Sequence, residues 1–182
     1  MLHVFQGVGG RWYQGSPKDV TRQLFAIWNV LQRRGIRYST ITQPSGYSDK
    51  VVSQHVRFFD EVIRNSEANC VDGTVVFASI LNKLAMRPVL AVKPGHMFLG
   101  LHLSKESCEQ KRDILFLETT DLGKHGAVGN ESESYREFVA ALNDGHTEFE
   151  TMVSSLNAHT PGFHVIEVAS ARRLGVAPIP RF

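Results

Sequence analysis

The sequence predicts an α+β protein, a class in which helices pack against an antiparallel sheet. After Cys70, apolar side chains recur on one helical face, at Val71, Val75, Ala78 and Leu81. Two short apolar runs, 89–92 and 96–103, flank a Pro-Gly turn and read as strands. A third strand-like run, 114–119, follows a polar segment. Because the chain has 182 residues, 42% of them hydrophobic, we expect one domain over residues 1–182.

The N-terminal part contains a helix with a recognisable start. Ser16 can cap it, Pro17 suits the first helical position, and Asp19 stands where a capping box needs an acid. Gly35 ends this helix. Its apolar stripe is Val20, Leu24, Trp28 and Leu31. The run 36–42 alternates with a period of two and predicts a strand.

The other elements follow from the same rules of periodicity and punctuation. Arg87 and Pro88 end the helix that begins at Cys70, and we expect Gly145 to end another helix. The predictions are a short helix near 59–67, a polar loop at 104–113, a loop at 121–133, helices at 134–143 and 147–158, a strand at 163–168 and a surface tail at 171–182.

Charge and composition exclude several classes. The net charge is +2 with both signs interspersed, so no basic footprint for nucleic acid is present. No apolar run approaches the roughly 20 residues that span a bilayer, so we expect no membrane segment. The N-terminus lacks a signal-peptide pattern, and Cys70 and Cys108 do not form a disulfide framework. These features favour a cytoplasmic protein, or an exported one if the chain is a mature or excised fragment.

Cys70, His96 and Glu118 are the candidate catalytic residues. A cysteine in the first helical turn sits at the positive end of the helix dipole, which favours the thiolate. His96 opens a strand, on the face of that strand that is less apolar than the one carrying Leu99 and Leu101. Glu118 closes the strand at 114–119, where an unpaired carboxylate would cost several kcal/mol. If these two strands pair antiparallel, their outer ends meet and Glu118 can orient His96.

These residues also carry a family resemblance. The segments 69–72 (NCVD), 95–100 (GHMFLG) and 116–120 (FLETT) resemble the transglutaminase-like superfamily of papain-like thiol enzymes, and bacterial transglutaminase-like domains in particular. The resemblance covers about residues 53–120, and residues 165–178 are weakly similar to a closing segment of those domains. It implies a papain-like core, with a cysteine-bearing helix packed on an antiparallel sheet, flanked by helices and a C-terminal strand. Cys70 would be the nucleophile, His96 the base and Glu118 the orienter of the base. Many members have Asp-Pro where this chain has Glu118 and Thr119.

The sequence also suggests roles for two further residues, Gln54 and Asp72. Papain-like enzymes place a side-chain donor beside the cysteine amide to complete an oxyanion hole, and Gln54, 16 residues before Cys70, is a candidate for that donor. A loop glutamine without such a role is an equally good reading. Asp72 is expected to cap its helix or to pair with Arg57 or Arg64 rather than to catalyse.

The sequence therefore predicts a cysteine peptidase or amidase that acts through a Cys-His-Glu triad and an acyl-enzyme, with a peptide or protein as substrate. A transglutaminase or acyltransferase would use the same triad, because only the group that resolves the acyl-enzyme differs. A catalytically inactive domain that binds a peptide or protein is the alternative outside enzymes. No cofactor and no metal are expected, since no closely spaced ligand pair such as CxxC or HxxxH is present. Substrate and oligomeric state stay open.

Overall fold

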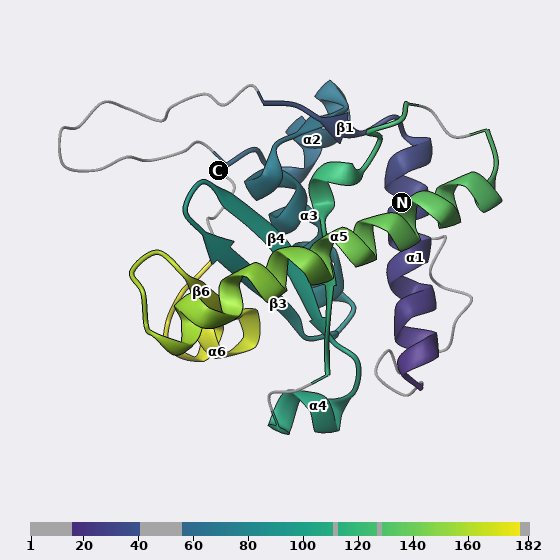
Figure 1. Cartoon of the computed structure of the whole chain (residues 1–182). Helices are drawn as coiled ribbons and strands as arrows, with labels where there is room; N and C mark the ends of the chain where they lie inside the picture. The colour runs from purple at the N-terminus through teal and green to yellow at the C-terminus, as the bar shows by residue number, and fades with distance from the viewer. Residues whose placement is uncertain (1–15, 41–55, 111–112, 127–128, 179–182) are drawn as a thin grey trace, which may run out of the picture.

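The fold was analysed in a computed structural model, which describes residues 16–40, 56–110, 113–126 and 129–178. The helices are α1 (Pro17–Arg33), α2 (Phe59–Asn65), α3 (Cys70–Lys83), α4 (Lys105–Gln110), the 3₁₀ turn η2 (Thr119–Asp121), α5 (Glu131–Asn157) and α6 (Val168–Arg173). The strands are β1 (Arg37–Tyr38), β2 (Glu67–Ala68), β3 (Pro88–Lys93), β4 (His96–His102), β5 (Ile114–Leu117) and β6 (His164–Glu167). The mixture of helices with an antiparallel sheet confirms the α+β class (Figure 1).

The main sheet has the strand order β5-β4-β3-β6, and each neighbouring pair is antiparallel. β3 and β4 form the predicted hairpin, closed at Lys93 and His96. β1 and β2 form a separate two-stranded parallel pair. Of the predicted strand at 36–42, the described part contains only β1, and residues 41 and 42 lie outside the described residues.

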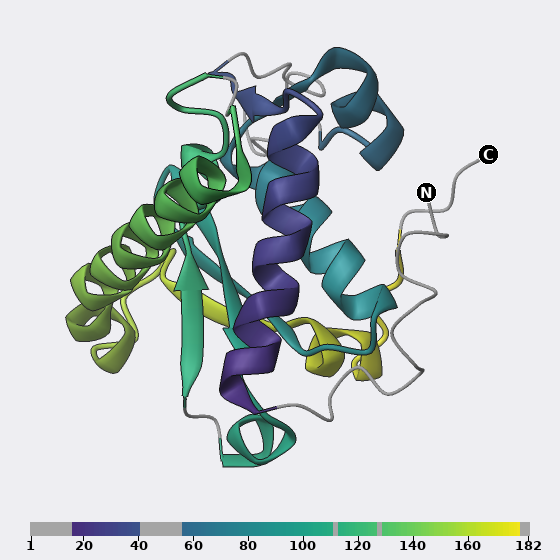
Figure 2. The same ribbon diagram turned by 90° about the vertical axis from the view of Figure 1, so that its right-hand side faces the viewer.

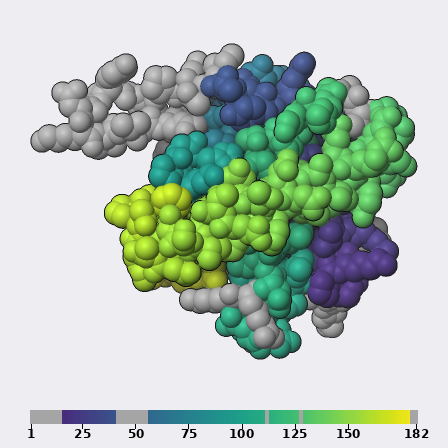
Figure 3. Space-filling model, viewed as in Figure 1, coloured from purple at the N-terminus to yellow at the C-terminus, as the bar shows by residue number. Residues whose placement is uncertain are grey.

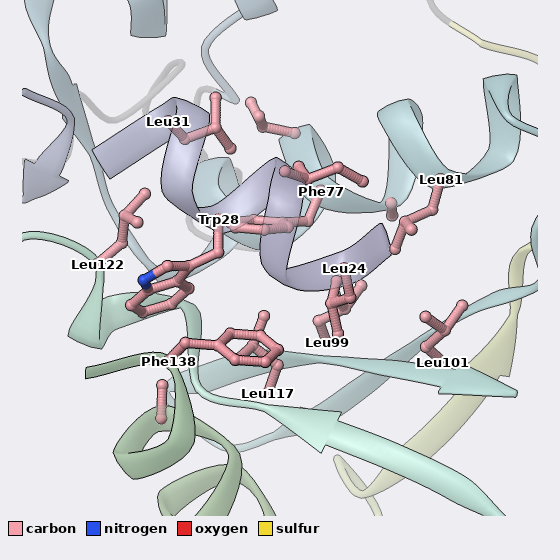
Figure 4. Close-up of a cluster of buried hydrophobic side chains, with 14 of the residues drawn as sticks. Leu24, Trp28, Leu31, Phe77, Leu81, Leu99, Leu101, Leu117, Leu122 and Phe138 are labelled. Atoms are coloured by element: carbon pink, nitrogen blue, oxygen red, sulfur yellow. The ribbon is translucent and has the colours of Figure 1, made fainter. Parts of the chain in front are cut away.

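Helices cover both faces of the sheet. In Figure 2, α3 and α5 lie on opposite sides of the strands, and α1 stands in front of them. On the α3 side, Leu99 and Leu101 of β4 pack into the larger core cluster with Phe77, and α1 adds Leu24 and Trp28 (Figure 4). The predicted helix start at Ser16 is confirmed, because its backbone N–H donates to the Asp19 carboxylate over 2.9 Å.

The second face of β4 is also buried, although the sequence predicts it to be the less apolar one. Phe98 is fully buried in a cluster with Phe116 of β5 and Met152 of α5. The long helix α5 runs across the molecule as a continuous band in the space-filling view (Figure 3). Because α5 supplies the cover, only the end of β4 at His96 remains partly open on this face.

Gly145 does not end a helix, contrary to the prediction. α5 continues from Glu131 to Asn157, and Gly145 is buried within it. A Cβ at this position would lie 2.7 Å from the Leu117 backbone nitrogen and 2.8 Å from that of Glu118. The glycine is therefore needed for the close approach of α5 to β5, and not for a helix stop.

The predicted polar loop at 104–113 contains a helix, α4. Ser104 and Ser107 cap its first turn reciprocally, since each backbone N–H donates to the other hydroxyl over 2.9 Å. The predicted strand at 163–168 is confirmed as β6, and the helix α6 covers the first residues of the predicted surface tail. Among the described residues, no helix is long and apolar enough to cross a membrane.

Candidate active site

Cys70 is the first residue of α3, and the local sequence explains why. Asn69 is the N-cap, and its side-chain oxygen accepts hydrogen bonds from the backbone N–H groups of Val71 and Asp72, both at 2.9 Å. Cys70 is partly buried. The N–H of a first helical residue has no acceptor within its own helix, so it is available to a ligand. The positive end of the α3 dipole lies at the same place.

His96 connects Cys70 to Glu118. Its Nε2 atom lies 2.6 Å from the Oε2 atom of Glu118. The imidazole also forms a hydrogen bond with the Cys70 thiol, and Nδ1 is the ring nitrogen that remains for it. The ring stacks on Phe98, with centroids 5.9 Å apart and planes inclined by 24°. The three residues that the sequence predicts to meet therefore lie together, with His96 in the middle.

The Glu118 carboxylate is held by several contacts. Its Oε1 atom accepts hydrogen bonds from the backbone N–H of Thr120 at 2.9 Å and from the Thr120 hydroxyl at 2.7 Å. Its own backbone N–H donates to the Ala141 carbonyl of α5 over 2.9 Å. Glu118 is only 5% exposed, and the hydrogen bonds with His96 and Thr120 replace those that water would make to its carboxylate.

Strand register explains why a glutamate reaches His96. Leu99 pairs with Leu117, so Glu118 follows one step beyond the last registered pair, on the level of Phe98. His96 lies two residues further along β4, on the same face as Phe98. The side chain must extend along the strand to meet the imidazole. The extra methylene of glutamate relative to aspartate supplies part of this reach.

The protonation states of the three groups are coupled. The hydrogen bond with His96 lowers the pKa of the Cys70 thiol; burial opposes this, and the N–H groups of Met97 and Val71 add to the lowering. Hydrogen bonds with Cys70 and Glu118 raise the pKa of His96 to about 10. Burial raises the pKa of Glu118, but hydrogen bonds from His96 and Thr120 outweigh it, so the net pKa is lowered. At neutral pH these directions favour a thiolate, an imidazolium and a carboxylate.

A threonine pair joins the elements that carry these residues. The Thr74 hydroxyl lies 2.7 Å from the Cys70 carbonyl oxygen, 3.2 Å from that of Met97 and 3.1 Å from the Thr119 hydroxyl. Helix α3, strand β4 and turn η2 are thus tied directly beneath the candidate site. Sequence reasoning did not identify Thr74, although its position one turn after the cysteine is a usable signal.

Asp72 has the structural role that the sequence predicts. Its carboxylate accepts the Arg57 backbone N–H at 2.8 Å and pairs with the Arg57 guanidinium at 3.0 Å. It also accepts the Asn69 N–H at 3.2 Å. Asp72 is fully buried, so this ion pair fixes the segment before α2 to the start of α3. Removing one partner would leave a buried charge uncompensated.

Tyr38 also belongs to the surroundings of the site, and sequence reasoning missed it. Burial raises the pKa of its phenol, and the negative charges of Cys70 and Glu118 raise it further, which places the ring within their electrostatic reach. Tyr38 is 42% exposed, so its ring is open to solvent as well as being within electrostatic reach of Cys70 and Glu118. Its strand, β1, was predicted, but pattern alone gives no sign that its side chain approaches Cys70.

A polar hollow of about 460 Å³ opens beside His96 and Glu118. Charged residues of both signs line it, namely Lys93, Asp121, Lys124, Asp144 and Glu148. Lys93 pairs with Glu148, and Lys124 pairs with Asp121 at 3.0 Å. The hollow can therefore accept a polar chain segment next to the imidazole.

The remaining predicted residue, Gln54, lies outside the described residues, so the structure does not place it. Of the four predicted site residues, the structure therefore places Cys70, His96 and Glu118. Comparisons of this chain with protein-family models, with curated proteins and with solved structures found no match.

Proposed function

We propose that this protein is a thiol-dependent hydrolase of amide or peptide bonds, built on a papain-like, transglutaminase-like core. One observation carries the proposal: His96 is hydrogen-bonded to the Cys70 thiol and, through Nε2, to Glu118 at 2.6 Å. This is the connection that a nucleophile, its base and the orienter of that base require. The cysteine-bearing helix α3, packed on the antiparallel strands β3 and β4, supports the choice of core.

The chemistry follows from the protonation states. The Cys70 thiolate attacks the substrate carbonyl carbon, and the negative charge moves to the carbonyl oxygen. The Cys70 N–H, which has no acceptor within its own helix, can stabilise that oxygen. The tetrahedral intermediate collapses, the C–N bond breaks, and His96 gives its proton to the leaving nitrogen. An acyl thioester remains on Cys70. Water then attacks the thioester carbonyl while His96 accepts a proton from it. The C–S bond breaks, the carboxylic acid is released, and the Cys70 thiolate and His96 imidazolium are restored.

A transglutaminase or acyltransferase differs only in the last step, where an amine replaces water. The hollow beside His96 is lined by polar and charged residues, so it is accessible to water. Hydrolysis needs no second binding site, so it is the favoured outcome.

The test is the relative reactivity of the two cysteines. Iodoacetamide is added to the chelator-treated full-length protein at pH 7, and modification of each cysteine is followed by mass spectrometry of peptides. We expect Cys70 to react at least about tenfold faster than Cys108, because only its thiol has a lowered pKa. A panel of peptide amides, quenched in acid, should leave an acyl group on Cys70 in the wild type and none in Cys70→Ala.

Equal, slow modification of both cysteines would reject the enzyme and favour a domain that only binds peptides. Fast modification of Cys70 without turnover of any amide would also favour a domain that only binds peptides. Release of an amine-linked product in preference to the free acid, when a primary amine is supplied, would shift the proposal to acyl transfer.

A further inference from the structure

A second group of one cysteine, one histidine and one glutamate lies at the other end of β4. His102 is the last residue of that strand, Cys108 is in α4, and Glu167 ends β6. One donor atom from each residue lies within 4.8 Å of the other two, and among the described residues this is the one such group. The distance from His102 Nε2 to Glu167 Oε1 is 3.5 Å. Strand β4 and the helix α4 that follows it therefore meet β6, which lies about 60 residues further along the chain, at one point.

We propose that His102, Cys108 and Glu167 form a zinc site that ties α4 and β6 to the end of β4. Zinc takes imidazole nitrogen, thiolate sulfur and carboxylate oxygen at about 2.0 to 2.3 Å. At tetrahedral angles such bonds put the donor atoms about 3.3 to 3.6 Å apart. The His102–Glu167 distance is already in this range, and the third donor, which lies within 4.8 Å of the other two, needs a shift of at most about 1.5 Å. The fourth position is open to water.

The surroundings of the three donors suit this role. The second carboxylate oxygen of Glu167 accepts the Ser170 hydroxyl at 3.0 Å, which turns the other oxygen toward His102. Such an outer contact is typical of metal ligands, because it fixes the orientation of the carboxylate. His102 is 1% exposed, whereas Cys108 and Glu167 are partly exposed. The histidine is thus held by the core, and the ion has a path from solvent.

The charges near Cys108 are mixed. Glu167, Arg87 and Arg173 all lie within electrostatic reach of the Cys108 thiol. A thiolate and a carboxylate neutralise a divalent cation, and the two arginines leave no excess negative charge around it. Binding must release the thiol proton, as in other cysteine-ligated zinc sites.

This site is separate from the proposed active site. His96 and His102 are six residues apart on β4, which corresponds to about 20 Å at about 3.3 Å per residue. The inference does not depend on the proposed function. A zinc ion here would hold the C-terminal strand and helix, β6 and α6, to the sheet, and it would not contact the reacting atoms.

The experiment uses the untagged, full-length protein, stripped of metal with a chelator and titrated first with Co²⁺ and then with Zn²⁺. We expect one Co²⁺ per chain, a thiolate-to-metal charge-transfer band, and displacement of Co²⁺ by Zn²⁺. Bound zinc should protect Cys108 from iodoacetamide and raise the thermal unfolding midpoint. Cys108→Ser should lose the charge-transfer band and bind at least about 100-fold more weakly, while Ser170→Ala should bind about tenfold more weakly.

Cys70→Ala is the decisive control, because Cys70, His96 and Glu118 offer the same donor types. This variant should bind Co²⁺ as the wild type does. Loss of the band in Cys70→Ala with retention in Cys108→Ser would overturn the proposal. Absence of saturable one-to-one binding in the correctly folded wild type would overturn it as well, and neither result would affect the test of Cys70 reactivity.

Discussion

Two Cys-His-Glu groups stand at opposite ends of β4, and they differ in shape. At the first end His96 lies between its partners, and its two ring nitrogens form hydrogen bonds with Cys70 and with Glu118. At the second end the donor atoms of His102, Cys108 and Glu167 lie within 4.8 Å of one another, a condition that the first group does not meet among the described residues. In the first group the central histidine can transfer a proton between its neighbours. In the second group three donor atoms at similar mutual distances can coordinate a cation.

The two cysteines differ for a physical reason. Cys70 begins a 14-residue helix and has N–H donors and an imidazole beside its sulfur, so its thiol has a lowered pKa. Cys108 is the fourth residue of a six-residue helix, and burial with Glu167 raises its pKa. Residue type alone therefore does not decide the chemistry. The arrangement of donors around each sulfur does.

The largest expected effect comes from removing the central histidine of the first group. His96→Ala should lower amide turnover about 10³- to 10⁴-fold, because base and proton donor are lost together. Alkylation of Cys70 at pH 7 should fall about 10- to 30-fold as its thiol returns toward an ordinary pKa. His102→Gln is the matched control and should leave both rates unchanged. A similar loss in both variants would contradict the distinction between the two ends.

Glu118→Gln should have the second largest effect. It replaces a charge-assisted hydrogen bond by a neutral one, which should cost about 1.5 to 3 kcal/mol of unfolding free energy and about 10- to 100-fold in turnover. Nuclear magnetic resonance should show the pKa of His96 moving down from about 10. Glu167→Gln is the control, and a drop in the His96 pKa in that variant would contradict the separation of the sites.

The same pair makes stability depend on pH. The pKa of His96 is raised from 6.5 to about 10, so its stabilisation is complete below pH 6.5 and is lost as the pH rises toward 10. The pKa of Glu118 is lowered from 4.5, so its stabilisation is present above pH 4.5 and is lost on acidification. Denaturant unfolding should therefore show the largest gap between wild type and Glu118→Gln between pH 4.5 and 6.5. A gap that does not vary with pH would exclude the ion pair as its cause.

Gly145→Ala tests how the carboxylate end of the first group is held. In an exposed helix, glycine to alanine stabilises by about 1 kcal/mol. Here the new Cβ would meet the Leu117 and Glu118 backbone, so we expect a net loss of about 1 to 3 kcal/mol in unfolding free energy. Gly129→Ala, whose Cβ would meet only the Glu133 carboxylate at 3.3 Å, should be nearly neutral. A stabilising Gly145→Ala would contradict the close packing of α5 on β5.

The smallest effect is expected from Thr120→Val, which removes the 2.7 Å hydrogen bond from the Thr120 hydroxyl to Glu118 but keeps the backbone one. The expected cost is about 1 kcal/mol of stability and a few-fold in turnover. Turnover as a function of pH should remain bell-shaped, since it requires both the Cys70 thiolate and the His96 imidazolium. A loss as large as that of Glu118→Gln would show that the hydroxyl, and not the carboxylate, orients His96.

Much of the fold could be predicted from local patterns. The capped start of α1, the helix that begins at Cys70, the hairpin of β3 and β4, and β6 are confirmed because capping, periodicity and turns act over a few residues. The predicted helix end at Gly145 is wrong because glycine has the same local signature whether it ends a helix or permits close packing. The helix α4 was missed because its polar residues give no apolar stripe.

For the sites, the sequence by itself determined which residues could take part, and in one case their arrangement. Cys70, His96 and Glu118 each stand at an element boundary, so the ends of neighbouring elements bring them together, and local rules predict this meeting. Tertiary structure alone decided that Tyr38 borders the site and that His102, Cys108 and Glu167 converge. Those contacts depend on strand register and on the packing of α4 and β6. Both arise from interactions across the whole sheet, so no motif of fixed residue spacing in the sequence predicts them.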